Sequence, residues 1–240
     1  MKKLQHKPIV GCMRWGVWGE NFTTVQYEQM IEQCLAIGLD IFDHADIYGD
    51  YTVEKEFGDA LKLNLSLRKS VQLISKCGIQ RFTPNRPGHK IHSYNTSKEH
   101  ILLSAEQSLK NLQTDYLDVL LIHRPDPLMH PDEIAAAFSD LKKSGKVLHF
   151  GVSNFTPSQM DMMMNSFPIE FNQLEVSVLK LEPFHNGILD KCIQHKIKPM
   201  AWGPLGSGKL FTDPDDEQHK KILAVAGILG EKYKVLTKYE

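Results

Sequence analysis

Four side chains that could carry proton-transfer chemistry stand at or just after the ends of short apolar runs: Asp43, Tyr48, Lys76 and His123. A tyrosine, with a pKa of about 10, is normally too weak an acid for this work at neutral pH, but a nearby ammonium group lowers that pKa. Lys76 could supply the ammonium, and Asp43 could hold and neutralise it. His123 could donate a hydrogen bond to the oxygen of a reacting carbonyl. These residue types fit the reduction of a carbonyl by hydride, in which the oxygen gains a proton.

Helical patterns and apolar runs alternate along the chain, and this alternation predicts the elements that must position those side chains. Helices are predicted at 24–37, 53–61, 97–112, 131–143, 156–165, 188–195 and 217–233. Strands are predicted at 9–13, 39–42, 71–74, 117–122, 147–152, 169–173 and 198–202. Short apolar strands separated by helices indicate a parallel sheet that is buried on both faces.

Such a series fits either an open doubly wound sheet or a closed barrel of eight strand–helix units. Seven units favour the barrel but leave it one unit short. In a barrel, chemistry gathers at the carboxyl ends of the strands, which is where the candidate side chains fall. A single aspartate there is usually a cap and a single lysine is usually solvated. Capping would favour Ser, Thr, Asp and Asn, so it does not explain strand ends that carry Lys, Tyr and His.

At these residues the sequence resembles the aldo-keto reductases. Asp43 and Tyr48 with four residues between them, followed by Lys76 and then His123, look like the Asp–Tyr–Lys–His tetrad of that family. The resemblance implies that Tyr48 is the proton donor and that His123 orients the substrate. It also implies that Lys76 tunes Tyr48 and that Asp43 anchors Lys76.

Two further stretches carry the same resemblance. Residues 151–155, Gly-Val-Ser-Asn-Phe, look like the cofactor-side signature of the family. Residues 43–49 together with 122–127 look most like its bacterial monomeric oxidoreductases. The resemblance runs from Pro8 to about Tyr233 and implies one domain over 1–240.

The resemblance implies a nicotinamide cofactor, NADPH. Ser153, Asn154 and Gln173 are expected to hydrogen-bond the carboxamide of its ring, and Trp202 is expected to stack against the ring. The other expected cofactor contacts are Gly11, Cys12, Met13, Asp43, Gly203, Leu205, Gly206, Ser207, Gly208 and Lys209. In the loop 206–209, backbone N–H groups could meet the pyrophosphate and Lys209 could add positive charge.

The expected fold is of the α/β class, a TIM (β/α)8-type barrel truncated before its eighth strand–helix unit, because a full barrel has roughly 250 residues or more. In the family the eighth unit holds the adenosine 2′-phosphate, so NADPH binding and activity are expected to be impaired. Full-length members are expected to be monomers. An open barrel would expose sheet edges that could associate with another chain.

Two alternative functions remain open. One is a non-catalytic barrel that binds a nucleotide and a protein partner, as in the channel-associated branch of the same family; that branch replaces the tetrad histidine, whereas this chain keeps His123. The other is a lyase that uses Lys76 as a Schiff-base nucleophile. A lyase would need no Tyr48, and it would leave Ser153, Asn154 and Gln173 unexplained.

The expected substrate is a small carbonyl compound. Trp15 and Trp18 on the first loop could line its pocket or pack the barrel rim. The long segment 80–96 is expected to form a lid on the substrate side. An aromatic lining would favour small apolar or aromatic carbonyls.

Composition excludes several other classes of protein. Lys and Arg number 28 and Asp and Glu number 29, giving a formal net charge of -1, so bulk positive charge does not point to nucleic acid. No apolar stretch is long enough to predict a membrane span, and the first residues do not resemble a signal peptide. The cysteines, which number 4, are scattered; they fit a cytoplasmic protein without disulfides, and no metal site is expected.

Overall fold

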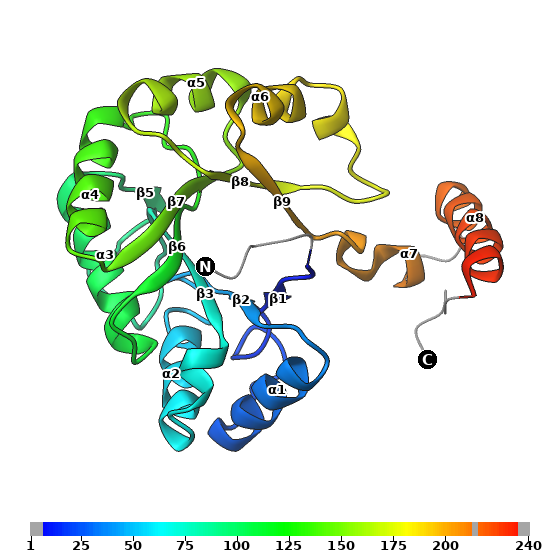
Figure 1. Cartoon of the computed structure of the whole chain (residues 1–240), viewed down its shortest axis with the longest axis horizontal. Coiled ribbons are helices and arrows are strands. Elements are labelled where there is room, and N and C mark those ends of the chain that lie inside the picture. Colours follow the sequence, from blue (N-terminus) through cyan, green and yellow to red (C-terminus); the bar gives the residue numbers. More distant parts are fainter. Residues whose placement is uncertain (1–6, 213–215, 235–240) are drawn as a thin grey trace.

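The computed structural model describes residues 7–212 and 216–234. Its central feature is a parallel sheet of 7 strands in the order β1-β2-β3-β6-β7-β8-β9 (Figure 1). These strands are β1 (Val10–Gly11), β2 (Ile41–Asp43), β3 (Gln72–Cys77), β6 (Leu117–Ile122), β7 (Val147–Ser153), β8 (Phe171–Glu175) and β9 (Lys198–Trp202). A separate antiparallel ladder joins β4 (Ile79–Gln80) to β5 (Ser93–Tyr94).

Helices α1 to α6 connect successive strands of the parallel sheet, and α7 and α8 follow β9. They are α1 (Thr24–Ala36), α2 (Val53–Leu63), α3 (Lys98–Asn111), α4 (Pro131–Lys143), α5 (Pro157–Ser166), α6 (Ile188–His195), α7 (Lys209–Thr212) and α8 (Glu217–Tyr233). Short 3-10 turns are η1 (Leu67–Ser70), η2 (Glu182–Phe184) and η3 (Gly206–Gly208). Local sequence explains several helix starts: Thr23 and Thr156 each form a capping box with a glutamine three residues on, and Pro131 and Pro157 occupy first helical positions.

The sheet curls, and α1 to α6 lie along its outer side (Figure 1). This arrangement confirms the predicted α/β class and barrel type, with seven barrel strands among the described residues. In that part of the chain β1 and β9 are the two ends of the strand order. No helix or strand was predicted in the segment 80–96, and its flanks pair as the β4–β5 ladder.

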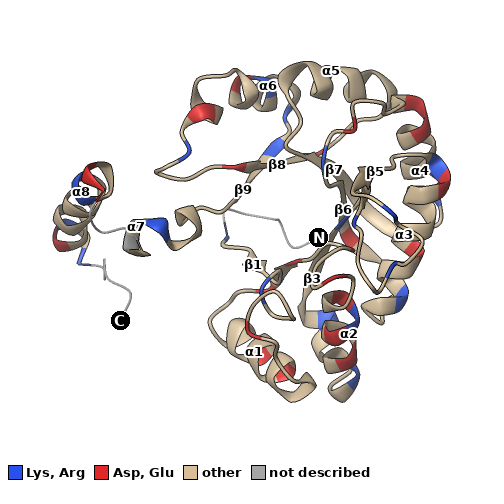
Figure 2. Cartoon of the chain, turned by 180° about the vertical axis from the view of Figure 1, so that it is seen from behind, with Lys and Arg blue, Asp and Glu red and all other residues tan. Residues whose placement is uncertain are grey.

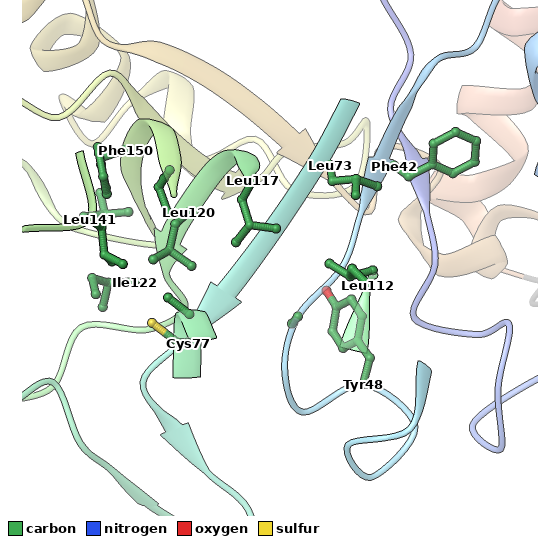
Figure 3. Packing of buried hydrophobic residues seen from close by; sticks show 14 of the residues in the cluster. Phe42, Tyr48, Leu73, Cys77, Leu112, Leu117, Leu120, Ile122, Leu141 and Phe150 are labelled. Atoms are coloured by element: carbon green, nitrogen blue, oxygen red, sulfur yellow. The ribbon is translucent and has the colours of Figure 1, made fainter. Parts of the chain in front are cut away.

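Two apolar clusters hold the sheet. The larger lies between the strands and the helices, where Leu120 and Ile122 of β6 pack beside Phe150 of β7 and Leu141 of α4 (Figure 3). The smaller lies inside the curl and consists of Ile41, Ile74, Val119, Leu121, Phe171 and Met200. Because successive side chains of a strand point to opposite faces, a continuous apolar run supplies both clusters, which explains the nearly unbroken apolar strands.

Acidic and basic residues are spread along the helices and their connections with both signs interspersed (Figure 2). Within residues 7–212 and 216–234, no helix has the length and apolarity that crossing a membrane requires. The first six residues, on which the expectation about a signal peptide partly rests, lie outside the described residues.

The packing of α2 on α3 generates a stability prediction at Gly58. A Cβ at this position would lie 1.9 Å from the backbone oxygen of Asn111 at the end of α3. Alanine is favoured over glycine in helices by roughly 1 kcal/mol, but this contact would force the two helices apart. We expect Gly58→Ala to lower the free energy of unfolding by about 1–3 kcal/mol, measured by urea denaturation.

The control is Gly227→Ala in α8, where a Cβ would meet no atom within 4 Å, and this variant should lose no stability. A more stable Gly58→Ala protein would contradict the close helix contact.

Candidate active site

The alternation of side chains along the strands builds the candidate site. Five apolar residues inside the curl are each followed, two residues later, by a polar or aromatic residue on the same side of the sheet. These pairs are Ile41 and Asp43, Ile74 and Lys76, Leu121 and His123, Phe171 and Gln173, and Met200 and Trp202. Because the strands are parallel, their carboxyl ends meet at one end of the barrel, and the polar members gather there.

Lys76 is the centre of this group. Its side chain is 1% exposed, and its Nζ lies 2.8 Å from both carboxylate oxygens of Asp43. The same ammonium donates to the backbone oxygen of His44 at 2.8 Å and to the Tyr48 hydroxyl at 3.2 Å. The structure therefore brings together the three residues that the sequence places at the ends of β2 and β3.

This network keeps Lys76 charged. Burial by itself would lower the pKa of the ammonium, but the carboxylate of Asp43 and the hydroxyl of Tyr48 raise it, so the pKa lies above its usual value. A Schiff base requires a neutral amine with a free lone pair. The Lys76 amine is protonated, enclosed and fully engaged as a donor, which argues against the lyase alternative.

Tyr48 is held in its acid form. Burial raises the pKa of the phenol above its usual value; the Lys76 ammonium lowers it and the Asp43 carboxylate raises it. From the sequence we expected Lys76 to bring the pKa of Tyr48 below its usual value. Lys76 does lower this pKa, but burial raises it by more. Because the Tyr48 oxygen accepts a hydrogen bond from Lys76, its own proton is free for another acceptor.

His123 lies beside Tyr48, with ring centres 6.0 Å apart. Burial lowers the pKa of its imidazole well below the usual value, and the charges of Lys76 and Arg124 lower it further, so the ring is neutral. Nδ1 is enclosed without a hydrogen-bond partner, which leaves Nε2 as the ring nitrogen open to the site. We assign the proton to Nε2, because an acceptor nitrogen without a partner costs less than a buried N–H without one.

Sequence reasoning missed how the loop after Tyr48 is held. Gly49, Asp50 and Tyr51 all have positive φ angles, of 57°, 55° and 74°. Such backbone is strained for residues other than glycine and persists only where surrounding contacts impose it. Arg81 supplies two of these contacts: its Nε donates to Asp50 Oδ1 at 3.1 Å, and its backbone N–H donates to the Tyr51 hydroxyl at 2.9 Å.

Trp18 and Trp15 have different surroundings. The Trp18 ring centre lies 6.3 Å from that of Tyr48, and the Arg81 guanidinium packs 4.7 Å above the Trp18 ring. Trp15 is buried in the larger apolar cluster, where it packs against Phe42 and three other aromatic rings. Of the two tryptophans considered for the substrate pocket, Trp18 borders Tyr48 and Trp15 belongs to the core.

The residues expected at a nicotinamide ring lie at the adjoining ends of β7, β8 and β9. Gln173 pairs in register with Ser153, and its Nε2 donates to Asp43 Oδ1 at 3.1 Å. Asn154 donates to Ser153 Oγ at 2.7 Å and accepts from Trp202 Nε1 at 3.1 Å. A carboxamide offers one donor group and one acceptor group, and this set of hydroxyl and amides provides partners for both. With Trp202 as the aromatic surface, the residues fit a nicotinamide.

The remaining expected cofactor residues are less uniform. Cys12 is fully buried, whereas Gly11, Met13 and Leu205 are exposed. In the 206–209 loop, the N–H groups of Gly206, Gly208 and Lys209 donate to carbonyls of residues 203–206. They are therefore engaged within the turn. The side chains of Ser207 and Lys209 are the groups of this loop best able to meet a phosphate.

Within residues 7–212 and 216–234, no three His, Cys, Asp or Glu side chains converge in a way that could hold a metal ion.

Comparison with known proteins agrees with this geometry. The family model described as "Aldo/keto reductase family" matches residues 9–232. An uncharacterized oxidoreductase of Bacillus subtilis (strain 168), YcsN, is 49% identical over 225 residues, which cover 93% of this chain and 74% of the relative. The 6-dehydroglucose reductase of Agrobacterium fabrum is 39% identical over 213 residues, covering 88% of this chain and 71% of the relative.

A solved structure is also similar. Aldo-keto reductase AKR11C1 from Bacillus halodurans, in its holo form, matches with a TM-score of 0.73 and 27% sequence identity. The match covers 87% of this chain and 65% of that chain, so this chain spans slightly less than two thirds of the solved protein.

The buried imidazole of His44 generates a prediction about pH. Its ring is enclosed against Phe57 with both nitrogens unpartnered, and burial, with the charge of Lys76, lowers its pKa to about 3. The unfolded value is about 6.5, so the folded protein binds fewer protons below that pH. The stability contribution of the neutral ring is complete above pH 6.5 and is lost as the pH falls toward 3.

We expect the free energy of unfolding to fall by about 2 kcal/mol from this group between pH 7 and pH 5, at about 1.4 kcal/mol per unit below 6.5. The measurement is urea denaturation of the wild type and of His44→Leu, which has no titrating ring, at both pH values. The variant should lose correspondingly less stability. Equal losses would show that the His44 ring takes up a proton in the folded protein.

Proposed function

The chain belongs to the aldo/keto reductase family, and we propose that it reduces an aldehyde or ketone to the alcohol, with Tyr48 as proton donor and a nicotinamide as the source of hydride. The observation that carries the proposal is the buried contact of Lys76 with both Asp43 and Tyr48, beside the neutral ring of His123. Carbonyl reduction needs a neutral acid that can become an anion next to a fixed cation, and these residues provide it.

Each residue of this group has a separate task. The Tyr48 O–H gives its proton to the carbonyl oxygen as negative charge develops there. Lys76, already bonded to the Tyr48 oxygen, stabilises the phenolate that remains. Asp43 holds the ammonium in place through both of its oxygens. His123 donates from Nε2 to the same carbonyl oxygen and fixes its direction.

The proposed cofactor is NADPH, which supplies the hydride when bound. Ser153, Asn154 and Gln173 would hold the carboxamide of the ring, with Trp202 against its face. The choice of the phosphorylated nucleotide rests on the resemblance to the family, and Lys209 is the cation of the 206–209 loop that could favour it. Titration of the protein with NADPH and with NADH, followed by fluorescence quenching, measures the preference.

The proposed substrate is a small carbonyl compound. Two of the relatives, at 39% and 36% identity, are 6-dehydroglucose reductases, whose names indicate an oxidised sugar as substrate. The segment 80–96 contacts both Trp18 and the loop after Tyr48, which supports its proposed place on the substrate side.

Replacing Tyr48 tests the assignment of the proton donor. We expect Tyr48→Phe to lower turnover of a nitrobenzaldehyde by at least about 100-fold, because the general acid is lost, and to leave cofactor binding unchanged. Turnover is measured by NADPH consumption and binding by fluorescence quenching. The control is Tyr116→Phe, which changes a tyrosine at the opposite, amino end of β6 and should retain activity. Full activity of Tyr48→Phe would contradict the assignment of Tyr48 as proton donor.

Replacing Lys76 tests how the tyrosine is tuned. Since the Lys76 charge lowers the pKa of Tyr48, Lys76→Met should raise it. The pH at which alcohol oxidation begins, which needs the phenolate, should therefore move upward, and both directions should slow. The substitution leaves Asp43 buried without a cation, so Lys76→Met with Asp43→Asn serves as a second variant that avoids the unpaired charge. An unchanged pH profile in both variants would contradict the role given to Lys76.

A further inference from the structure

Arg124 has no task in the mechanism above, yet it lies beside two residues of the site. It directly follows His123, and its charge lowers the pKa of that imidazole. Its guanidinium carbon lies 5.5 Å from the centre of the Trp202 ring. Arg124 is therefore next in the chain to the residue proposed to hold the carbonyl oxygen, and its guanidinium lies near the residue proposed to pack on the nicotinamide.

The charge of Arg124 is not balanced by the protein. Two neighbouring cations of the site have carboxylate partners, Lys76 with Asp43 and Arg81 with Asp50. Within the described ranges, no carboxylate oxygen lies within 4.0 Å of the Arg124 guanidinium, and its N–H groups have no hydrogen-bond acceptor. A half-buried guanidinium without an anion loses part of its hydration and gains no ion pair in return.

We propose that the substrate is a carbonyl compound that also carries a carboxylate, and that Arg124 binds this carboxylate. The proposal rests on the proposed function and specifies its substrate class. The guanidinium lies beside the Trp202 ring, and because its N–H groups have no acceptor among the described residues, their planar fork is available to the two oxygens of a carboxylate. Because Arg124 adjoins His123, the carboxylate belongs within a few bonds of the carbonyl.

A comparison of two aldehydes, one with and one without a carboxylate, tests whether the carboxylate contributes to binding. Succinate semialdehyde and pentanal have similar length, but only the first carries a carboxylate. A charge-assisted hydrogen bond is worth enough to change affinity by roughly tenfold to a hundredfold, so the wild type should have a kcat/KM for the semialdehyde at least about tenfold higher. The difference should lie mainly in KM and should shrink as salt is added.

Substitutions assign the preference to a residue. Arg124→Met should remove most of the preference while retaining turnover of pentanal, and Arg124→Lys should restore part of it as a point charge. Arg68→Met is the matched control, because it removes a guanidinium whose central carbon lies 4.2 Å from the centre of another aromatic ring, that of Tyr116 at the opposite, amino end of β6. This control should keep the full preference.

Binding of butyrate, a carboxylate that cannot be reduced, gives a readout independent of turnover. Titration by tryptophan fluorescence should show weaker binding to Arg124→Met than to the wild type and to Arg68→Met. Equal binding by all three proteins overturns the proposal, whether or not either aldehyde is reduced.

The activity results keep the two proposals apart. Reduction of both aldehydes without preference overturns the carboxylate assignment and leaves the proposed function standing. Absence of any reduction by the wild type argues against the proposed function, and butyrate binding then decides the role of Arg124. If Arg124→Met slows both aldehydes equally and weakens NADPH binding, Arg124 serves the cofactor, and the carboxylate assignment fails.

Discussion

The buried ammonium of Lys76 is the interaction on which the rest of the site depends. A charge at 1% exposure is tolerated only when it is paired and hydrogen-bonded, because the cost of removing it from water is several kcal/mol. The Asp43 carboxylate, the His44 carbonyl and the Tyr48 hydroxyl together satisfy it, and all three come from β2 and the loop that follows it. The end of β3 thereby fixes the position of the neighbouring loop. The location of Tyr48 against Lys76 follows from the same electrostatic requirement.

The same burial gives the two polar rings of the site their protonation states. Burial raises the pKa of the Tyr48 phenol and lowers the pKa of the His123 imidazole. Both shifts favour the neutral form, so both rings are uncharged. For Tyr48 this means a proton ready to leave toward an acceptor beside a cation that can stabilise the anion. For His123 it means a hydrogen-bond donor that adds no positive charge next to Lys76. A more open site would lose both effects, because solvent would screen Lys76 and hydrate the phenolate.

Much of this arrangement could be predicted from the sequence because it depends on local periodicity. The parallel strands, the helices between them and the polar residues at the carboxyl ends of the strands follow from apolar runs, helical spacing and caps. The β4–β5 ladder was not predicted, since each of its strands has only two residues. The contacts of Arg81 with Asp50 and Tyr51 were missed for a different reason: they join residues about 30 positions apart, and no local pattern marks them. The net direction of the Tyr48 pKa also required the structure, because it depends on how far burial exceeds the effect of Lys76.

The strained loop after Tyr48 links these observations. Asp50 and Tyr51 hold left-handed backbone at a cost of order 1–3 kcal/mol each, and contacts from the segment after β4 stabilise them there. Arg81 makes two of those contacts and also packs on Trp18, whose ring borders Tyr48. The position of Tyr48 is thus determined from two sides, by Lys76 at the end of β3 and by Arg81 beyond β4. Lys76 is neutralised by Asp43 at the end of β2 and Arg81 by Asp50 of the loop, whereas Arg124, beside Trp202, has no carboxylate partner in the described part of the chain and its charge is available to a ligand.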